Sequence, residues 1–317
     1  MKKDLVSVVF PTMNRKEDLI KCIKSIKEST HKKIEIIIGD NGSIDGTKEE
    51  IKKRFPEVIL LKNKLNLGSP IAINNCIKRS TGEFILRLDD DVIIAKDTIK
   101  KMLNVLKSNF KIGAVSCLYF YTEKPEILRT VGMKINMFLG KTKTPFQGKK
   151  YESEFENEIL DVNFAGGGSL LARRTTYDKI GFYPEEYFLM YEDAEWCNRL
   201  RKRGFKLVVV GSAKLYHKTV TPQKRESPFR VYLINRSQVL FMKRNAGWKN
   251  IIFFPYLFIF LYPAKALRFL FKKNIPAMKS LTKGIFDALF NEKIFVYTKD
   301  GKQVSYLKNL GYEYENS

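Results

Sequence analysis

The sequence predicts an α/β fold of the Rossmann-like kind, with a mainly parallel central sheet flanked by helices. Over the first 120 residues, short runs rich in β-branched residues alternate with amphipathic stretches, which is typical of strands joined by crossover helices. The chain has 317 residues, of which 44% are hydrophobic. This length and composition are enough for a large core and argue against intrinsic disorder.

The elements follow from two hydrophobic periods. Strands are expected at residues 6–10, 33–40, 57–62, 83–88 and 112–119. Between them, apolar residues three or four positions apart predict helices. These are Leu19, Ile20, Ile23 and Ile26, then Ile71, Ile73 and Ile77, then Ile99, Leu103 and Leu106. Residues 122–160 have no such period and contain Pro and Gly, so we expect loops or a less regular excursion over the sheet there.

Charge and cysteine usage limit the possible surroundings of the protein. The formal net charge is +23, and residues 201–283 hold 19 Lys or Arg but a single acid, Glu226. Such a surface favours an anionic partner, which could be nucleic acid, a phosphorylated substrate or the acidic cytoplasmic leaflet. The four cysteines form no C-x-x-C pair, which fits a reducing cytosol better than a disulfide framework.

An apolar segment near the C-terminus predicts contact with a membrane. Residues 251–262 are almost wholly apolar, and Pro255, Pro263, Lys265 and Arg268 interrupt what would otherwise be a spanning helix. Cations flank and punctuate the run, as expected for an interfacial or re-entrant segment on anionic lipid. The alternative is a helix buried at a domain interface or in a homodimer.

Three consecutive acids follow the apolar strand at residues 83–88. Ligands collect at the carboxyl ends of strands in an open α/β sheet, which is where Asp89, Asp90 and Asp91 are expected. In an extended chain Asp89 and Asp91 project to the same side, so they could share one hard cation while Asp90 points elsewhere. The alternative is an acidic turn that caps the next helix.

A second acidic cluster opens a predicted helix at residues 191–205. Glu192, Asp193 and Glu195 precede a basic far end, an order that the helix dipole alone would explain. A carboxylate beside apolar neighbours such as Trp196 could instead act as a general base. His217 follows the next strand and could complete a metal site, although a lone histidine there is more often structural.

Polar loops follow the first two expected strands. They read PTMNR and GDNGSIDGT, and their side chains could hydrogen-bond a base and a ribose. Ordinary turn chemistry would explain them equally well. Neither loop is a G-x-G-x-x-G or a Walker A sequence, so dinucleotide-binding and P-loop proteins are disfavoured.

Six segments together carry a resemblance to a known family. They are FPTMNR, IGDNGSIDGT, NLGSPIAINN, ILRLDDDV, FAGGGSLLARR and YFLMYEDAEWCNRLRKRGFKL. In this order and spacing, over roughly residues 4–220, they resemble glycosyltransferase family 2, a large inverting family with the GT-A fold. The implied organisation is a catalytic domain at 1–222, with a donor half at 1–120 and an acceptor half at 121–222, and a helical, membrane-associating extension at 223–317.

The resemblance implies a role for each matching residue. Metal ligands for Mn²⁺ or Mg²⁺ would be Asp89, Asp91 and His217, and the catalytic base would be Asp193. The donor nucleotide would meet Pro11, Thr12, Asn14, Arg15, Asp40, Asn66, Gly68, Asn74 and Asp90. On the acceptor side we expect Glu192 and Trp196.

The implied reaction is a single displacement with inversion, from a nucleotide-sugar donor to a hydroxyl of a lipid-linked or surface-glycan acceptor, at the cytoplasmic face of the cell membrane. A polyprenyl phosphate is the alternative acceptor. A non-catalytic basic protein that binds membranes or nucleic acid would leave both acidic clusters unexplained, so we expect no nucleic-acid partner. A sugar nucleotidyltransferase would need a Gly-rich first loop, which PTMNR is not.

Overall fold

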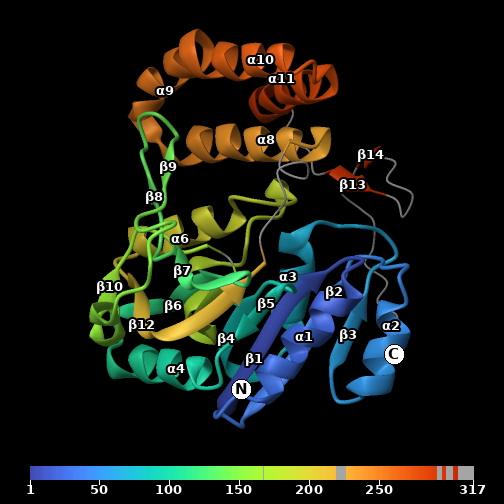
Figure 1. Cartoon of the computed structure of the whole chain (residues 1–317), viewed down its shortest axis with the longest axis vertical. Coiled ribbons are helices and arrows are strands. Elements are labelled where there is room, and N and C mark those ends of the chain that lie inside the picture. The colour runs from blue at the N-terminus through green and yellow to red at the C-terminus, as the bar shows by residue number, and fades with distance from the viewer. Residues whose placement is uncertain (167, 219–225, 291–294, 298–302, 306–317) are drawn as a thin grey trace.

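The computed structural model describes residues 1–166, 168–218, 226–290, 295–297 and 303–305. Its centre is a ten-stranded mixed sheet with helices on both faces (Figure 1). The main path through the sheet runs β10-β12-β6-β11-β4-β1-β2-β3, with β5 paired to β12 and β7 to β6. The predicted α/β class, with a mainly parallel central sheet flanked by helices, is therefore confirmed.

The strands of the sheet have the following bounds. They are β1 (Lys2–Thr12), β2 (Ile34–Asp40), β3 (Ile59–Lys62), β4 (Gly82–Leu88), β5 (Val92–Ile94), β6 (Ile112–Tyr121), β7 (Lys124–Thr130), β10 (Ile159–Asp161), β11 (Ser169–Arg173) and β12 (Lys206–His217). Two small pairs stand apart, β8 (Lys134–Ile135) with β9 (Thr142–Lys143), and β13 (Phe295–Tyr297) with β14 (Gln303–Ser305). Residues 122–160, where we expected loops or a less regular excursion over the sheet, contain short strands and a 3₁₀ turn, η1 (Ser153–Asn157).

The direction of the strands brings several of their carboxyl ends to one edge of the sheet. β4, β1, β2 and β3 are mutually parallel, and β1 and β2 end in register at Thr12 opposite Asp40. β12 is parallel to β6, whereas β11 inserts antiparallel between β4 and β6. The carboxyl ends of β1, β2, β4 and β12 therefore face one edge of the sheet, where ligands of α/β proteins bind.

Alternating side chains of β1 divide the core into two layers. Val8 and Phe10 pack with helices α1 (Lys16–Lys27), α2 (Thr47–Arg54) and α4 (Thr98–Ser108). Val9 packs on the opposite face with α3 (Ser69–Arg79), α5 (Arg174–Ile180) and α6 (Glu192–Lys202). This is the period of two that a strand buried on both faces requires.

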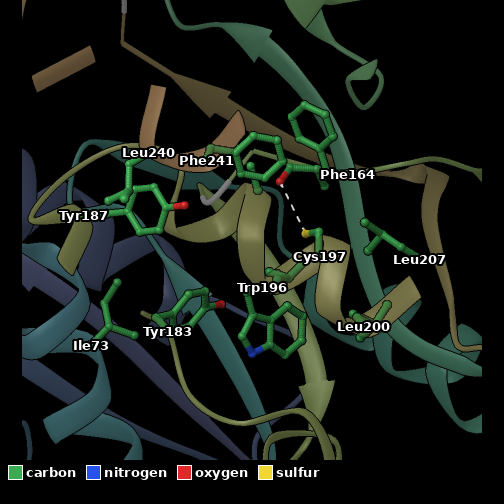
Figure 2. Close-up of a cluster of buried hydrophobic side chains, with 14 of the residues drawn as sticks. Ile73, Phe164, Tyr183, Tyr187, Trp196, Cys197, Leu200, Leu207, Leu240 and Phe241 are labelled. Carbon is green, nitrogen blue, oxygen red and sulfur yellow. Dashed lines mark hydrogen bonds between the residues drawn. The ribbon is translucent and has the colours of Figure 1, made fainter. Parts of the chain in front are cut away.

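The first C-terminal helix belongs to the second of these layers. α8 (Pro228–Asn245) contributes Leu240 and Phe241 to the cluster that contains Trp196 and Tyr187 (Figure 2). Beyond it lie η3 (Gly247–Lys249), α9 (Asn250–Tyr256), the π-helical turn η4 (Leu257–Leu261), α10 (Tyr262–Phe271) and α11 (Ile275–Phe290), which form the upper part of Figure 1.

The apolar segment is helical through both of its prolines, which differs from the interruption that we expected. Residues Gly247–Phe271 form one run of 25 residues, with mean hydropathy 1.5 in its most apolar window and only 11% of that window buried. Pro255 lies inside α9 and Pro263 opens α10, directly after η4. A π-turn shifts the hydrogen-bond register, so it can absorb the donor that a proline lacks. Among the described residues this run alone is long and apolar enough to cross a membrane.

Candidate active site

The acids after β4 and the last residue of β12 converge on one point. β5 pairs antiparallel with the end of β12, which sets His217 opposite Val92 and thus beside the acids. The imidazole Nε2 lies 3.4 Å from Oδ2 of Asp89 and 3.6 Å from Oδ1 of Asp91. One ligand atom from each of these three residues lies within 4.8 Å of the others.

A hydrogen bond on one ring nitrogen of His217 leaves the other, Nε2, facing the acids. Nδ1 lies 3.1 Å from the carbonyl oxygen of Lys218, and a carbonyl can only accept, so Nδ1 carries the proton in that hydrogen bond. In the neutral ring Nε2 then carries the lone pair, and Nε2 is the atom that faces Asp89 and Asp91. A ring held by its other nitrogen in this way is the usual arrangement of a histidine metal ligand.

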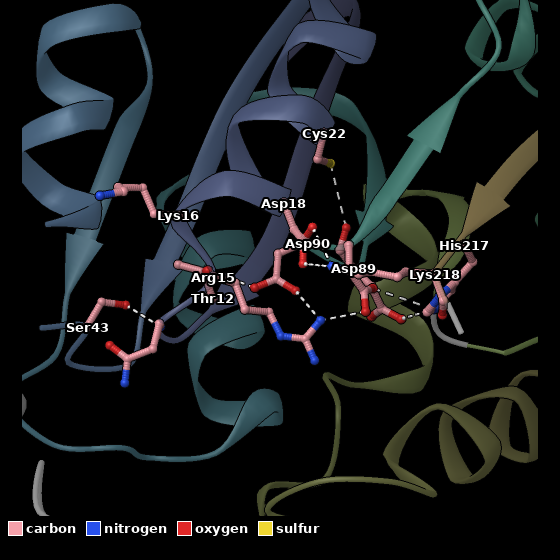
Figure 3. A network of polar contacts seen from close by, with 12 residues as sticks. Thr12, Arg15, Lys16, Asp18, Cys22, Ser43, Asp89, Asp90, His217 and Lys218 are labelled. Carbon is pink, nitrogen blue, oxygen red and sulfur yellow. Dashed lines mark hydrogen bonds and ion pairs between the residues drawn. The ribbon is translucent and has the colours of Figure 1, made fainter. Parts of the chain in front are cut away.

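Asp90 points away from this cluster, as alternation along the chain predicts. Its Oδ2 accepts a 2.7 Å hydrogen bond from Thr12 Oγ1, and the Arg15 guanidinium lies 3.6 Å from its Oδ1 (Figure 3). Burial raises the pKa of Asp90 to about 7, although Arg15 and Thr12 act in the opposite direction. Arg15 also reaches Asp91 Oδ2 at 2.5 Å, so one cation bridges two of the three acids.

The second acidic cluster begins α6 and faces the same space. Glu192 is the first residue of the helix, and its side chain is 3% exposed. Asp193 follows, with its Oδ1 accepting a 2.8 Å hydrogen bond from the amide of Ala194. The carboxylates at the start of α6 and those after β4 together line one cleft of about 460 Å³.

A strained segment leads into α6. Phe188, Met190 and Tyr191 all have φ between 61° and 70°, in the left-handed region that non-glycine residues rarely occupy. The segment is fixed from two sides. The amide of Ser69 donates to the carbonyl of Phe188 at 2.7 Å, and Ser237 Oγ in α8 donates to the carbonyl of Leu189 at 3.1 Å. Backbone strain that the surroundings impose in this way is concentrated at functional sites.

Comparison with known proteins identifies this arrangement. The family model for glycosyl transferase family 2 matches residues 7–180, which is more than half of the chain. The chain belongs to this family. The resemblance that the sequence suggested is therefore confirmed, and the reading as a non-catalytic basic protein is not favoured.

Two relatives of this family 2 glycosyltransferase cover most of its length. One is the N-acetylglucosaminyl-diphospho-decaprenol L-rhamnosyltransferase of Mycobacterium tuberculosis, 25% identical over 77% of this chain and 86% of its own length. Another is the GalNAc(5)-diNAcBac-PP-undecaprenol beta-1,3-glucosyltransferase of Campylobacter jejuni, 26% identical over 72% of this chain and 71% of its own length.

Solved structures confirm the GT-A fold. The mannosyltransferase PcManGT from Pyrobaculum calidifontis, in complex with GDP-Man and Mn²⁺, has a TM-score of 0.55 at 15% identity and covers 92% of this chain and 88% of its own. GalNAc-T7 with UDP, GalNAc and Mn²⁺ has a TM-score of 0.60 at 17% identity and covers 74% of this chain, which spans about half (47%) of GalNAc-T7.

Most residues that the sequence singled out line the cleft of this family 2 enzyme. They are Pro11, Thr12, Arg15, Asn66, Gly68, Asp89, Asp90, Asp91, Glu192, Asp193 and His217. Four others lie outside its lining. Asn14 joins the two polar loops, since its Oδ1 accepts from the amide of Ile44 at 2.8 Å. Asp40 is fully buried and accepts from the amide of Ser43, and its Oδ2 has no hydrogen-bond partner in the described part of the chain.

The other two residues outside the lining support the structure. Asn74 bonds both the carbonyl and the amide of Tyr183, and Trp196 donates from Nε1 to the carbonyl of Gly181 at 3.1 Å. Sequence reasoning missed several lining residues, among them Asn41, Ser69, Arg87, Arg129, Phe229 and Arg230. The sequence did offer a sign of Arg87, because Arg87 and Glu83 are the two charged residues of the otherwise apolar strand β4.

Proposed function

We propose that this glycosyltransferase transfers a sugar from a nucleoside-diphosphate donor to a hydroxyl of a lipid-linked glycan, with inversion at the anomeric carbon. The observation that carries the proposal is the shared cleft. The cluster of two carboxylates and one imidazole and the carboxylate at the start of α6 face the same cleft, which has a volume of about 460 Å³. The first suits a divalent cation with a diphosphate, and the second suits proton removal from an acceptor.

The cation would be held by Asp89, Asp91 and His217. Two carboxylates and one imidazole with its Nε2 directed inward form a donor set that fits Mn²⁺, and Mg²⁺ with more water ligands. Such a cation, when bound, supplies charge neutralisation for a leaving diphosphate. The bound Mn²⁺ named with both similar structures supports this assignment.

The donor nucleotide would lie over the ends of β1 and β2. Thr12, Arg15 and Asn66 line this side of the cleft, and Arg15 carries the positive charge nearest to the acids. The buried Oδ2 of Asp40, without a protein partner among the described residues, could accept an N–H of the base.

Asp193 would act as the general base. Its carboxylate accepts the proton of the acceptor hydroxyl, whose oxygen forms the new bond to the anomeric carbon while the bond to the donor phosphate breaks and the nucleoside diphosphate leaves. The strained segment before α6 fixes where Asp193 lies, so little reorganisation is needed when the acceptor binds.

Lipid linkage of the acceptor rests on the C-terminal helices and the two relatives. α8 contributes Phe229 and Arg230 to the cleft, and it packs against α11 beneath an apolar layer that includes exposed Phe258, Ile259 and Phe271. Lys265 turns inward to Asn235 of α8 at 2.7 Å, which leaves the apolar side of α10 outward. Such a helix would lie on the anionic cytoplasmic leaflet as a peripheral or monotopic anchor. Both relatives are named for polyprenol-linked substrates, which favours a lipid-linked glycan over free polyprenyl phosphate.

Thermal stabilisation by nucleoside diphosphates tests the donor side. Purified protein would be heated with UDP, GDP, dTDP or ADP, with and without Mn²⁺, beside Asp91→Ala and the control Asp97→Ala, whose carboxylate pairs with Lys101 in α4. A metal-dependent shift with one nucleotide, absent only in Asp91→Ala, supports the proposal. Transfer of label from that nucleotide's sugars into extracted lipid then tests the acceptor, and label that remains water-soluble with every sugar contradicts it.

A further inference from the structure

A buried arginine connects the two halves of the cleft. Arg87 lies in β4, two residues before Asp89, and its side chain is 4% exposed. Its Nη2 is 3.4 Å from Oδ1 of Asp89 and 3.3 Å from Oε1 of Glu192. One guanidinium nitrogen thus joins the acids after β4 to the first residue of α6.

This bridge is unfavourable as a purely structural feature. Nε and Nη1 of Arg87 and Oε2 of Glu192 are buried and have no hydrogen-bond partner within the described residues. Burial disfavours the charge on Arg87, yet Asp89 and Glu192 outweigh it and hold the pKa of Arg87 above its usual value. A buried, incompletely bonded ion pair is generally no more stabilising than an apolar pair of the same size.

The bridge through Arg87 links the donor side of the cleft to the helix that carries Asp193. Asp89 belongs to the donor side, and Glu192 is covalently adjacent to Asp193 at the start of α6. On its other side the guanidinium lies 5.9 Å from the ring centroid of Tyr183, a contact that limits its movement. Any displacement of Arg87 would therefore change the separation between the cation site and the base.

We propose that Arg87 is a positioning residue for sugar transfer, which holds Glu192 and the start of α6, including Asp193, at a fixed distance from Asp89. The inference rests on the proposed function, because it needs Asp193 to act on the acceptor and Asp89 to act on the donor side. Arg87 itself touches neither the acceptor hydroxyl nor the anomeric carbon in this assignment. A direct contact of Arg87 with the donor diphosphate is the competing role.

Four variants separate positioning from stability and from donor binding. Arg87→Met removes the bridge and leaves Glu192 buried without a partner, whereas Arg87→Met combined with Glu192→Met removes both charges. Arg87→Lys keeps the charge without the planar fork. Arg174→Met is the control, because Arg174 bonds the carbonyls of Gly82 and Ser80 at the amino end of β4, opposite the end that leads to the cleft.

The measurements are melting temperature, nucleotide affinity with Mn²⁺, and kcat and KM for the donor. Arg87→Met should keep nucleotide affinity within about threefold while kcat falls about 10²-fold, with Arg87→Lys in between. The double variant should recover melting temperature without recovering kcat, and Arg174→Met should lose melting temperature alone. Recovery of kcat together with stability in the double variant overturns the proposal, as does a loss of nucleotide affinity that accounts for the whole effect. Full kcat in Asp193→Asn would instead contradict the proposed base, whatever Arg87 does.

Discussion

His217 Nε2 lies 3.4 Å from an oxygen of Asp89 because β12 pairs with β5 immediately after the three acids. Replacing His217 with Asn should therefore weaken the binding of Mn²⁺ and leave the sheet intact. We expect the Mn²⁺ concentration for half-maximal activity to rise about 10- to 100-fold, with partial recovery at saturating metal. Titration of activity with Mn²⁺ after chelation measures this.

His31 provides the matched control for that prediction. It is the other of the two histidines and hydrogen-bonds the carbonyl of Lys33 in an exposed loop. His31→Asn should not change the metal requirement. Equal metal dependence in both variants would remove His217 from the metal site.

Some residues of the site could be predicted from the sequence, and others could not. Asp89 and Asp91 were predictable, because an apolar strand that ends in acids fixes both their edge of the sheet and their common side. His217 reaches them only through the β12–β5 pairing, which no local pattern encodes. The family resemblance supplied this residue, since a lone histidine after a strand is more often structural.

Neighbours along the chain were a poor guide to neighbours in the cleft. Trp196 is close to Asp193 in sequence, but a helix turns successive residues around its axis, and Trp196 enters the core, where it is 0% exposed. Arg87 shows the reverse, since its place within a buried strand concealed that its tip reaches Glu192. Pairings between distant elements, such as β4 with α6, are set by tertiary packing.

Replacing Asp193 with Asn should abolish proton removal without affecting the donor. We expect kcat to fall about 10²- to 10⁴-fold, with nucleotide affinity in Mn²⁺ unchanged. Glu195→Gln is the control in the same helix, because Glu195 accepts a 2.5 Å hydrogen bond from Tyr187 and faces away from the cleft. Steady-state transfer rates and calorimetric nucleotide binding give both quantities. Similar kcat losses in the two variants would indicate damage to α6 and not loss of a base.

Glu35, which lies at the edge of the sheet far from the cleft, should make the stability of the fold depend on pH. Burial opposes its ionisation, but hydrogen bonds from Ser7, Thr81 and Gly82 prevail and lower its pKa below the ordinary 4.5. A lowered carboxyl pKa stabilises the fold above the unfolded pKa, and this stabilisation is lost as pH falls through the folded pKa.

Glu35→Gln should therefore lower the free energy of unfolding by about 1 kcal/mol at pH 7, a figure that allows for solvent screening of the half-buried group. The gap to the unmodified protein should close as pH falls below 4.5. Urea unfolding of both proteins between neutral and acidic pH measures the gap, and kcat at neutral pH should not change. A gap that persists in acid would contradict the assignment.

The exposed apolar side of α10 and η4 should bind anionic vesicles. Phe258 and Ile259 are 49% and 64% exposed, and Lys272 and Lys273 lie at the end of the same helical run. Combining Phe258→Ser with Ile259→Ser should reduce co-sedimentation with phosphatidylserine-containing vesicles about tenfold or more, because two large apolar side chains no longer enter the interface.

Phe110→Ser is the control for the vesicle experiment. Phe110 is 82% exposed and directly follows α4 in the chain. Helix α4 lies at the opposite end of the molecule from α10 (Figure 1). This substitution should leave vesicle binding unchanged. High salt should weaken binding of the unmodified protein, because part of the attraction comes from cations near lipid headgroups. Binding that is insensitive to Phe258 and Ile259 would contradict an interfacial role for this surface.

Gly68 and Gly148 both have a positive φ but differ in their surroundings, so the pair tests how the strained segment supports catalysis. Their φ values are +85° and +81°, where alanine is disfavoured, so alanine at Gly148 should cost about 1 kcal/mol of stability and alanine at Gly68, whose ψ is 164°, about 1–3 kcal/mol. A Cβ on Gly68 would lie 2.6 Å from the carbonyl oxygen of Phe188, whereas one on Gly148 would meet nothing within 4 Å.

Gly68→Ala must therefore displace Phe188, whose carbonyl accepts from Ser69 and whose segment leads to Asp193. We expect Gly68→Ala to lower kcat about tenfold or more, because a small shift of the base misaligns it with the acceptor. Gly148→Ala should lower melting temperature alone. Melting curves and transfer rates for both variants separate the two effects: equal kcat in the two would mean that the segment tolerates movement, and that its strain does not hold the base in place.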